Sequence, residues 1–186
     1  MLDVGEHGPM RYVALLRGVT PTNPQMRNVN LRRVVESLGY TDVATVITTG
    51  NVVFSSSSRS TAKLEEALEA AWRTELGFAS TTVVRSRTQL HELIDADPFA
   101  AAATDERGWQ ATFLKHRPSE LLDVPFVPDG FPQMTVVRSD HLTVCTALEL
   151  DGGGGPAAMG WLERRYGPAI TTRTWKTVTR VVAAMS

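Results

Sequence analysis

The segment Val43-Ala-Thr-Val-Ile-Thr-Thr-Gly-Asn-Val-Val-Phe-Ser55 decides the fold class. It contains two runs rich in β-branched residues, 43–48 and 52–55, which are separated by Gly50-Asn51. Glycine and asparagine tolerate the positive φ angles of a tight turn, so the segment predicts a β-hairpin with antiparallel strands. A hairpin set among helical patterns indicates an α+β protein.

The elements on either side of this hairpin complete a β-α-β-β-α-β order. In chain order we expect a strand, a helix, the hairpin, a helix and a strand, at residues 12–16, 30–38, 43–55, 61–76 and 81–85. Asn30 is the predicted N-cap of the first helix. Ser86-Arg-Thr-Gln89 has the form of a capping box and predicts one appended helix. The order is that of a ferredoxin-like fold.

The rest of the chain repeats this order with weaker signals. The expected elements are strands at 109–114, 133–137, 141–149 and 170–172, a short helix at 118–122, and helices beginning near Pro156 and Thr174. We therefore expect two tandem ferredoxin-like halves with antiparallel sheets. The predicted boundaries are a flexible tail at 1–10, a first half at 11–99 with the extra helix, and a second half at 100–186 with a C-terminal helix.

Composition excludes several classes of protein. Nineteen basic and twenty acidic side chains nearly cancel, so bulk charge does not favour nucleic acid or an anionic membrane as partner. No apolar run approaches the ~20 residues that a membrane span needs. Cys145 is the only cysteine, so no intrachain disulfide is possible. Together with a start that lacks the features of a signal peptide, this favours a cytoplasmic location.

Four phrases of the sequence, taken in order and spacing, carry a family resemblance. They are Arg11-Tyr-Val-Ala-Leu-Leu-Arg-Gly-Val19, Leu38-Gly-Tyr-Thr-Asp-Val43, Thr49-Gly-Asn-Val-Val-Phe-Ser55 and Thr171-Thr-Arg-Thr-Trp-Lys-Thr-Val178. The chain resembles the bacterial family called domain of unknown function 1697 over roughly residues 10–185. The resemblance implies an α+β fold with ferredoxin-like subdomains and brings no established activity. Thr20 and Thr174 stand where the family's pattern has asparagine, so a site that such residues form in relatives is expected to be altered here.

Six residues are candidates for ligand binding: Arg17, Gly18, Asn51, Arg173, Trp175 and Lys176. Arg17 follows a buried strand, and the adjacent Gly18 allows a ligand to approach the backbone. Arg173, Trp175 and Lys176 lie at a predicted helix N-terminus, where a guanidinium and an indole can hold an anion or stack on a base. The structural alternatives are a salt bridge that fixes the loop after Arg17 and a Trp175 side chain that fills the core.

No pattern in the sequence assigns a catalytic residue, a cofactor or a metal. The four histidines stand outside any metal-binding spacing, and no phosphate loop or nucleophile elbow is present. We therefore expect a binding module for an anionic small molecule or nucleotide, in a groove between the halves lined by Arg17, Asn51 and Arg173. The alternatives are a small-molecule enzyme of unassigned reaction, a nucleic-acid-binding protein and a purely structural role. Nucleic acid is disfavoured because the strands lack the aromatic pair of RNA-binding sheets. The sequence does not fix an oligomeric state.

Overall fold

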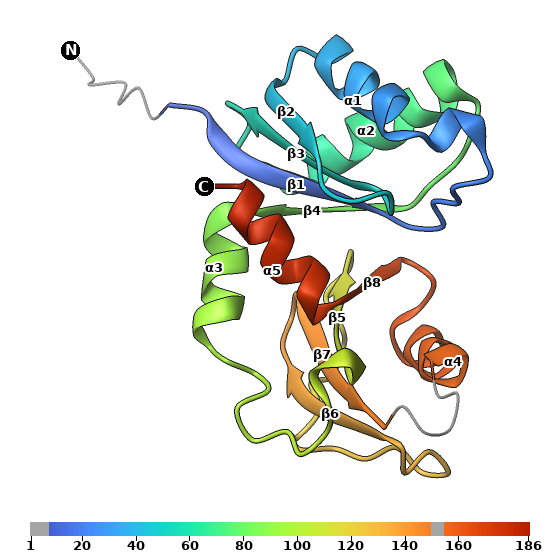
Figure 1. Ribbon diagram of the computed structural model, residues 1–186, viewed down its shortest axis with the longest axis vertical. Helices are drawn as coiled ribbons and strands as arrows, with labels where there is room; N and C mark the ends of the chain where they lie inside the picture. Colours follow the sequence, from blue (N-terminus) through green and yellow to red (C-terminus); the bar gives the residue numbers. More distant parts are fainter. Residues whose placement is uncertain (1–7, 150–154) are drawn as a thin grey trace.

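The computed structural model describes residues 8–149 and 155–186 and shows an α+β protein. Its described residues form two four-stranded antiparallel sheets and five α-helices. Figure 1 shows the two sheets one above the other, with helices on their outer faces and two helices between them at one side. None of the helices in the described part of the chain is both long and apolar enough to cross a bilayer.

The first sheet has the strand order β2-β3-β1-β4. Its strands are β1 (Met10–Leu16), β2 (Thr41–Thr45), β3 (Asn51–Ser56) and β4 (Thr82–Ser86). Helices α1 (Asn28–Ser37) and α2 (Thr61–Leu76) cover one face of this sheet. Side chains of β1 alternate between the two faces: Tyr12 and Ala14 pack against these helices, and Val13 and Leu15 point to the opposite face.

The second sheet has the corresponding order β6-β7-β5-β8. Its strands are β5 (Trp109–Leu114), β6 (Met134–Ser139), β7 (Thr143–Leu148) and β8 (Ile170–Thr174). Helix α4 (Gly155–Tyr166) packs on one face through Leu162, which meets Leu114, Val144 and Ile170. The opposite face of this sheet turns toward the first half of the chain.

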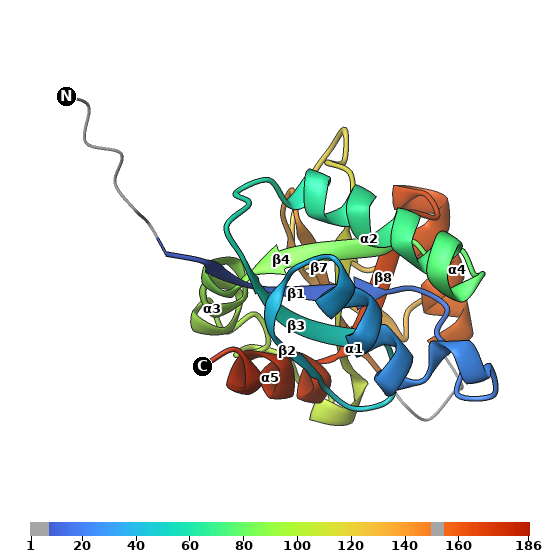
Figure 2. The ribbon, with the colours of Figure 1, turned by 90° about the horizontal axis from the view of Figure 1, so that it is seen from above.

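The two halves share one apolar core. Helices α3 (Arg87–Asp95) and α5 (Trp175–Ala184) contact each other beside the junction of the sheets, as Figures 1 and 2 show from two directions. Val13 and Leu15 from the first sheet belong to the same cluster as Ala111 and Phe113 from the second. Because the cluster draws on both halves, each half buries apolar surface that it would expose alone.

Three local predictions need correction. Helix α1 begins at Asn28 with Arg27 in the cap position, so Asn30 lies inside the helix. The turn of the hairpin lies between Thr45 and Asn51, and Asn51 is already the first residue of β3, where its side chain donates a hydrogen bond to the carbonyl of Val46. Asn51 therefore stabilises the turn through a side-chain hydrogen bond that it makes from its position in β3.

The third correction concerns the predicted helix at 118–122, which is absent, since residues 115–133 contain no helix. A five-residue run forms too few i→i−4 hydrogen bonds to support a helix by itself. Phe126 instead pairs with Val136 of β6 through a short antiparallel bridge. Of the predicted tail, residues 1–7 lie outside the described residues, and β1 already begins at Met10.

Candidate functional site

Arg173 occupies the centre of the junction between the two sheets. It lies on β8, and its guanidinium reaches across to the first half of the chain. Nε donates to the Oδ1 atom of Asn51 at 2.6 Å. The terminal nitrogens donate to one hydroxyl and four backbone carbonyls, those of Thr171, Thr172, Leu16, Thr49 and Gly50. Burial lowers the pKa of Arg173 to about 10, so it keeps its charge at neutral pH.

Arg17 makes a second link across the same junction. It follows β1 and donates hydrogen bonds to the carbonyls of Pro168 and Ile170 at 3.0 and 3.1 Å. It also forms an ion pair with Glu163 of α4. Gly18 adopts a φ of +71°, and a Cβ there would meet nothing within 4 Å. Asn51 and Arg173 are thus in direct contact, and Arg17 makes its contacts across the same junction, but protein acceptors occupy the donors of all three.

Trp175 and Lys176 lie in a different place. Trp175 is the first residue of α5 and meets Phe99 edge-on, with ring centroids 5.0 Å apart. Lys176 is exposed, and the two residues help to line a hollow of about 350 Å³ that also contains Trp109. The preceding Thr174 caps α5, since its hydroxyl accepts a hydrogen bond from the backbone N–H of Thr177. The predicted cluster is therefore split between the junction and this hollow.

A cavity that sequence reasoning did not find lies on the other side of the junction. It has a volume of about 290 Å³ and lies between α3 of the first half and the β6–β7 turn of the second. Its lining combines apolar and charged side chains, among them Leu90, Leu93, Phe113, Glu92, Arg85, Arg117, Arg138, Asp140 and His141. We call this space the Arg85 cavity.

Arg85 is the buried cation of the cavity. Only 4% of the residue is exposed, and it lies near the end of β4. One terminal nitrogen donates to the carbonyl of Val84, and the other donates to the carbonyls of Leu114 and Leu142 in the second half. Its Nε is buried without any hydrogen-bond acceptor among the described residues.

The charge of Arg85 also lacks a carboxylate at contact distance. Ion pairs in the described ranges do not include it, and Glu65 and Asp140 act on it only from farther away. Burial is the main influence and lowers the pKa of Arg85 to about 10, which leaves the guanidinium charged at neutral pH. A buried charge that is neither paired nor fully hydrogen-bonded is costly, and such groups occur preferentially at functional sites.

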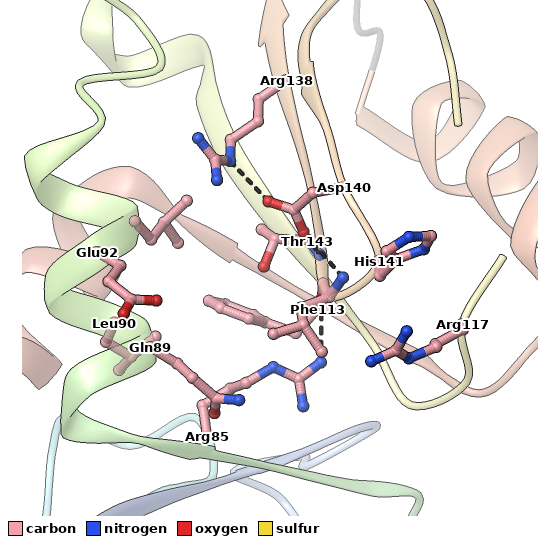
Figure 3. Close-up of a pocket in the computed structure, with 12 residues that line it drawn as sticks. Arg85, Gln89, Leu90, Glu92, Phe113, Arg117, Arg138, Asp140, His141 and Thr143 are labelled. Carbon is pink, nitrogen blue, oxygen red and sulfur yellow. Dashed lines mark hydrogen bonds and ion pairs between the residues drawn. The ribbon is translucent and has the colours of Figure 1, made fainter. Parts of the chain in front are cut away.

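Two further arginines approach the same space. Arg138 pairs with Asp140 at 2.8 Å, and the Asp140 carboxylate also accepts the backbone N–H groups of Leu142 and Thr143, which fixes the β6–β7 turn. Arg117 is exposed and makes no hydrogen bond or ion pair within residues 8–149 and 155–186. Figure 3 shows the guanidinium groups of Arg85 and Arg117 pointing toward each other from opposite sides, with His141 nearby.

Two glutamates of α2 accept hydrogen bonds from the edge of β4 beside the cavity. The backbone N–H groups of Thr82 and Val84 donate to the carboxylates of Glu69 and Glu65, so the edge strand has no open donors at these positions. Lys115 of the second half pairs with Glu69 and adds another link between the halves. Burial raises the pKa of Glu65, although the Val84 hydrogen bond and nearby cations counteract the shift.

Comparison with known proteins places the chain in a family and gives it a structural relative. The family model described as "Protein of unknown function (DUF1697)" matches residues 10–123, and the chain belongs to this family. The conserved bacterial protein SP0830 from Streptococcus pneumoniae has a similar structure, with a TM-score of 0.72. Its sequence is 20% identical, and the match covers 96% of this chain and 99% of that one. No curated protein matches the sequence.

Proposed function

We propose that the protein is a binding module for a small anionic molecule held in the Arg85 cavity. The observation that carries this proposal is the charged, buried guanidinium of Arg85. Among the described residues, its Nε has no acceptor and its charge has no carboxylate at contact distance. An anion that enters the cavity supplies the missing countercharge. The gain is larger here than in water because only 4% of Arg85 is exposed, so its charge is poorly screened by solvent.

The position of the cavity supports a role in ligand binding. Arg85 and α3 come from the first half, whereas Phe113, Arg117 and the β6–β7 turn come from the second. Clefts between two packed units are common places for small-molecule sites. We propose in addition that the halves, 11–99 and 100–186, are two ferredoxin-like units, an interpretation that the matching strand orders β2-β3-β1-β4 and β6-β7-β5-β8 support.

A thermal-shift screen with matched variants tests the proposal. The panel contains mono- and dicarboxylates, phosphate esters and nucleotides. We expect at least one anion to raise the melting temperature of the wild type and to have no such effect on Arg117→Ala. Arg117 is exposed and makes no polar contact in the described chain, so its removal leaves stability unchanged. A ligand at 100 times its Kd adds about 2.7 kcal/mol, or roughly 5–11 °C for a chain of this size.

Two other variants locate the binding site. Arg180→Ala removes an exposed arginine of α5 outside the cavity and serves as the charge control. Lys176→Ala tests the hollow beside Trp175, where the sequence predicted a ligand. Loss of the shift in Lys176→Ala but not in Arg117→Ala would move the site to that hollow. The absence of any shift across the panel would remove the binding proposal.

A further inference from the structure

We infer that the anion recognised by the Arg85 cavity is a phosphoryl group, carried as a monoester on a small hydroxylated molecule. This inference rests on the proposed function, because it names the class of ligand for the same cavity. The arrangement of charge differs between the two ends of the cavity.

At one end, positive charge is not balanced. The guanidinium groups of Arg85 and Arg117 point toward each other, and His141 lies on the same side (Figure 3). In the described chain neither arginine has a carboxylate within 4.0 Å. Two cations that face each other repel. A dianion bound between them attracts both guanidinium groups and offsets this repulsion. A monoanion neutralises the charge of only one of the two arginines.

The geometry of the two guanidinium groups favours a tetrahedral head. A carboxylate is planar and presents its two oxygens in one plane, which suits a single guanidinium fork. A phosphoryl group presents three terminal oxygens in different directions, so one edge can meet the fork of Arg117 while another oxygen faces the guanidinium of Arg85, whose terminal nitrogens also donate to backbone carbonyls. Arg85 contributes from β4 and Arg117 from the segment after β5, so the opposed positions arise from the packing of the two halves.

The other residues that line the cavity indicate the chemistry of the rest of the ligand, beyond its phosphoryl group. Leu90, Leu93 and Phe113 form an apolar surface, and Gln89 and Glu92 of α3 add polar groups at its border. Figure 3 shows Glu92 on the helix facing the cavity, across from the arginines. A carboxylate accepts hydrogen bonds from hydroxyl groups. The volume of about 290 Å³ lies at the lower limit of ordinary ligand pockets, which favours a compact ester over a nucleotide.

Isothermal titration calorimetry at neutral pH tests the inference. The probes are glycerol 3-phosphate as the ester, inorganic phosphate and sulfate as isolated tetrahedral anions, and succinate and acetate as carboxylates. We expect glycerol 3-phosphate to bind most tightly, phosphate and sulfate more weakly, and the carboxylates least. Arg117→Ala is expected to weaken binding of glycerol 3-phosphate by about tenfold or more, since one charge-assisted fork is lost. Arg180→Ala is expected to bind like the wild type.

Two more variants keep the inference falsifiable. Arg117→Lys retains the charge without the fork and is expected to bind with intermediate affinity. Glu92→Gln is expected to weaken glycerol 3-phosphate but not inorganic phosphate, because the carboxylate is placed to accept from the hydroxyl groups of the ester body. If succinate binds at least as well as the phosphates and depends on Arg117, the phosphoryl inference is wrong and the proposed anion site stands. If no probe binds, both are overturned.

Discussion

Arg173, which is half-buried, and Arg85, which is buried, are arginines that reach from one half of the molecule to the other, yet their surroundings differ. Arg173 donates to six acceptors, and its Nε is satisfied by Asn51. Arg85 donates to three carbonyls, its Nε has no acceptor in the described part of the chain, and a second arginine faces it. The same type of side chain therefore has a structural role at one place and an incomplete set of partners at the other.

This difference shows how a structural arginine can be distinguished from a binding one. A guanidinium has five N–H donors, and when the protein supplies an acceptor for each, nothing remains to recognise a ligand. Where the protein leaves a donor and the charge unmatched in a buried position, the missing partner has to come from outside or the cost remains. Substitutions at the two arginines are therefore expected to have different effects on stability.

The largest effect is expected from Arg173→Met. The substitution keeps much of the apolar stem but leaves the Asn51 amide oxygen and the Thr49 carbonyl without the donor that Arg173 supplies, whereas the Gly50 carbonyl still accepts the backbone N–H of Leu16. We expect a loss of about 3 kcal/mol in the free energy of unfolding, or roughly 6–12 °C in melting temperature. Chemical denaturation monitored by circular dichroism measures it. A variant that is as stable as the wild type would show that the Arg173 contacts do not hold the halves together.

The next effect tests the turn that supplies acceptors to Arg173. Gly50 has a φ of +73°, and a Cβ there would lie 2.5 Å from Cγ2 of Val19. Gly50→Ala is therefore expected to cost about 2 kcal/mol, from backbone strain and from the displacement of Val19. Gly39→Ala is the matched control, since Gly39 has a φ of +80° but a Cβ added to it would meet nothing within 4 Å. If the two variants lose the same free energy of unfolding, the contact with Val19 does not contribute to the cost of Gly50→Ala.

A smaller effect on stability is expected from Arg85→Met. The substitution removes three hydrogen bonds, but it also removes a buried charge, and the carbonyl of Leu142 still accepts the backbone N–H of Leu114. Replacing a buried charge by an apolar side chain of similar length is often neutral, so we expect a change within about 1 kcal/mol. Urea denaturation of Arg85→Met beside Arg173→Met makes the comparison. If both variants lose the same stability, the two arginines have the same structural role.

Helix ends could be predicted from the sequence, because hydrogen bonds between residues close together in the chain determine them. The capping box predicted at Ser86 and Gln89 is present with both of its hydrogen bonds, and Gly77 ends α2 in the left-handed conformation. The helix predicted at 118–122 did not form, since its signal was a few helix-compatible residues without a long apolar stripe. The position of Asn51 in a strand, and not in the turn, depends on its contacts with Val46 and Arg173, which no local pattern contains.

The candidate site could be anticipated only in part. The sequence predicted a groove lined by Arg17, Asn51 and Arg173, whereas the cavity proposed as the binding site is lined by Arg85, Arg117 and the turn after Arg138. Arg85 gave one usable signal in the sequence, because it is a charged residue directly after the two valines of a predicted strand. Its meaning depends on residues far along the chain, such as Leu114 and Leu142, that only the packing of two sheets brings to it. The structural alternative for Arg17, a salt bridge, agrees with its contact with Glu163.

The smallest effect concerns Glu65, which lies beside β4 on the Arg85 side of the junction. Burial raises its pKa in the folded protein, so the folded state binds a proton more tightly than the unfolded state does. Glu65 therefore contributes stability that is fully present below its unfolded pKa and is lost as the pH rises through its folded pKa. Glu65→Gln removes this contribution but keeps an oxygen that can accept the backbone N–H of Val84.

We accordingly expect the melting temperature of Glu65→Gln, relative to the wild type, to increase from about pH 4 to about pH 8. The lowered pKa of Arg173 arises from burial and lies above this range, so the pH dependence of Arg173→Met is expected to parallel that of the wild type. Melting curves in buffers of constant ionic strength measure both. A difference between Glu65→Gln and the wild type that stays constant with pH would show that Glu65 titrates alike in both states. The Glu65 carboxyl would then make no pH-dependent contribution to stability on the Arg85 side of the junction.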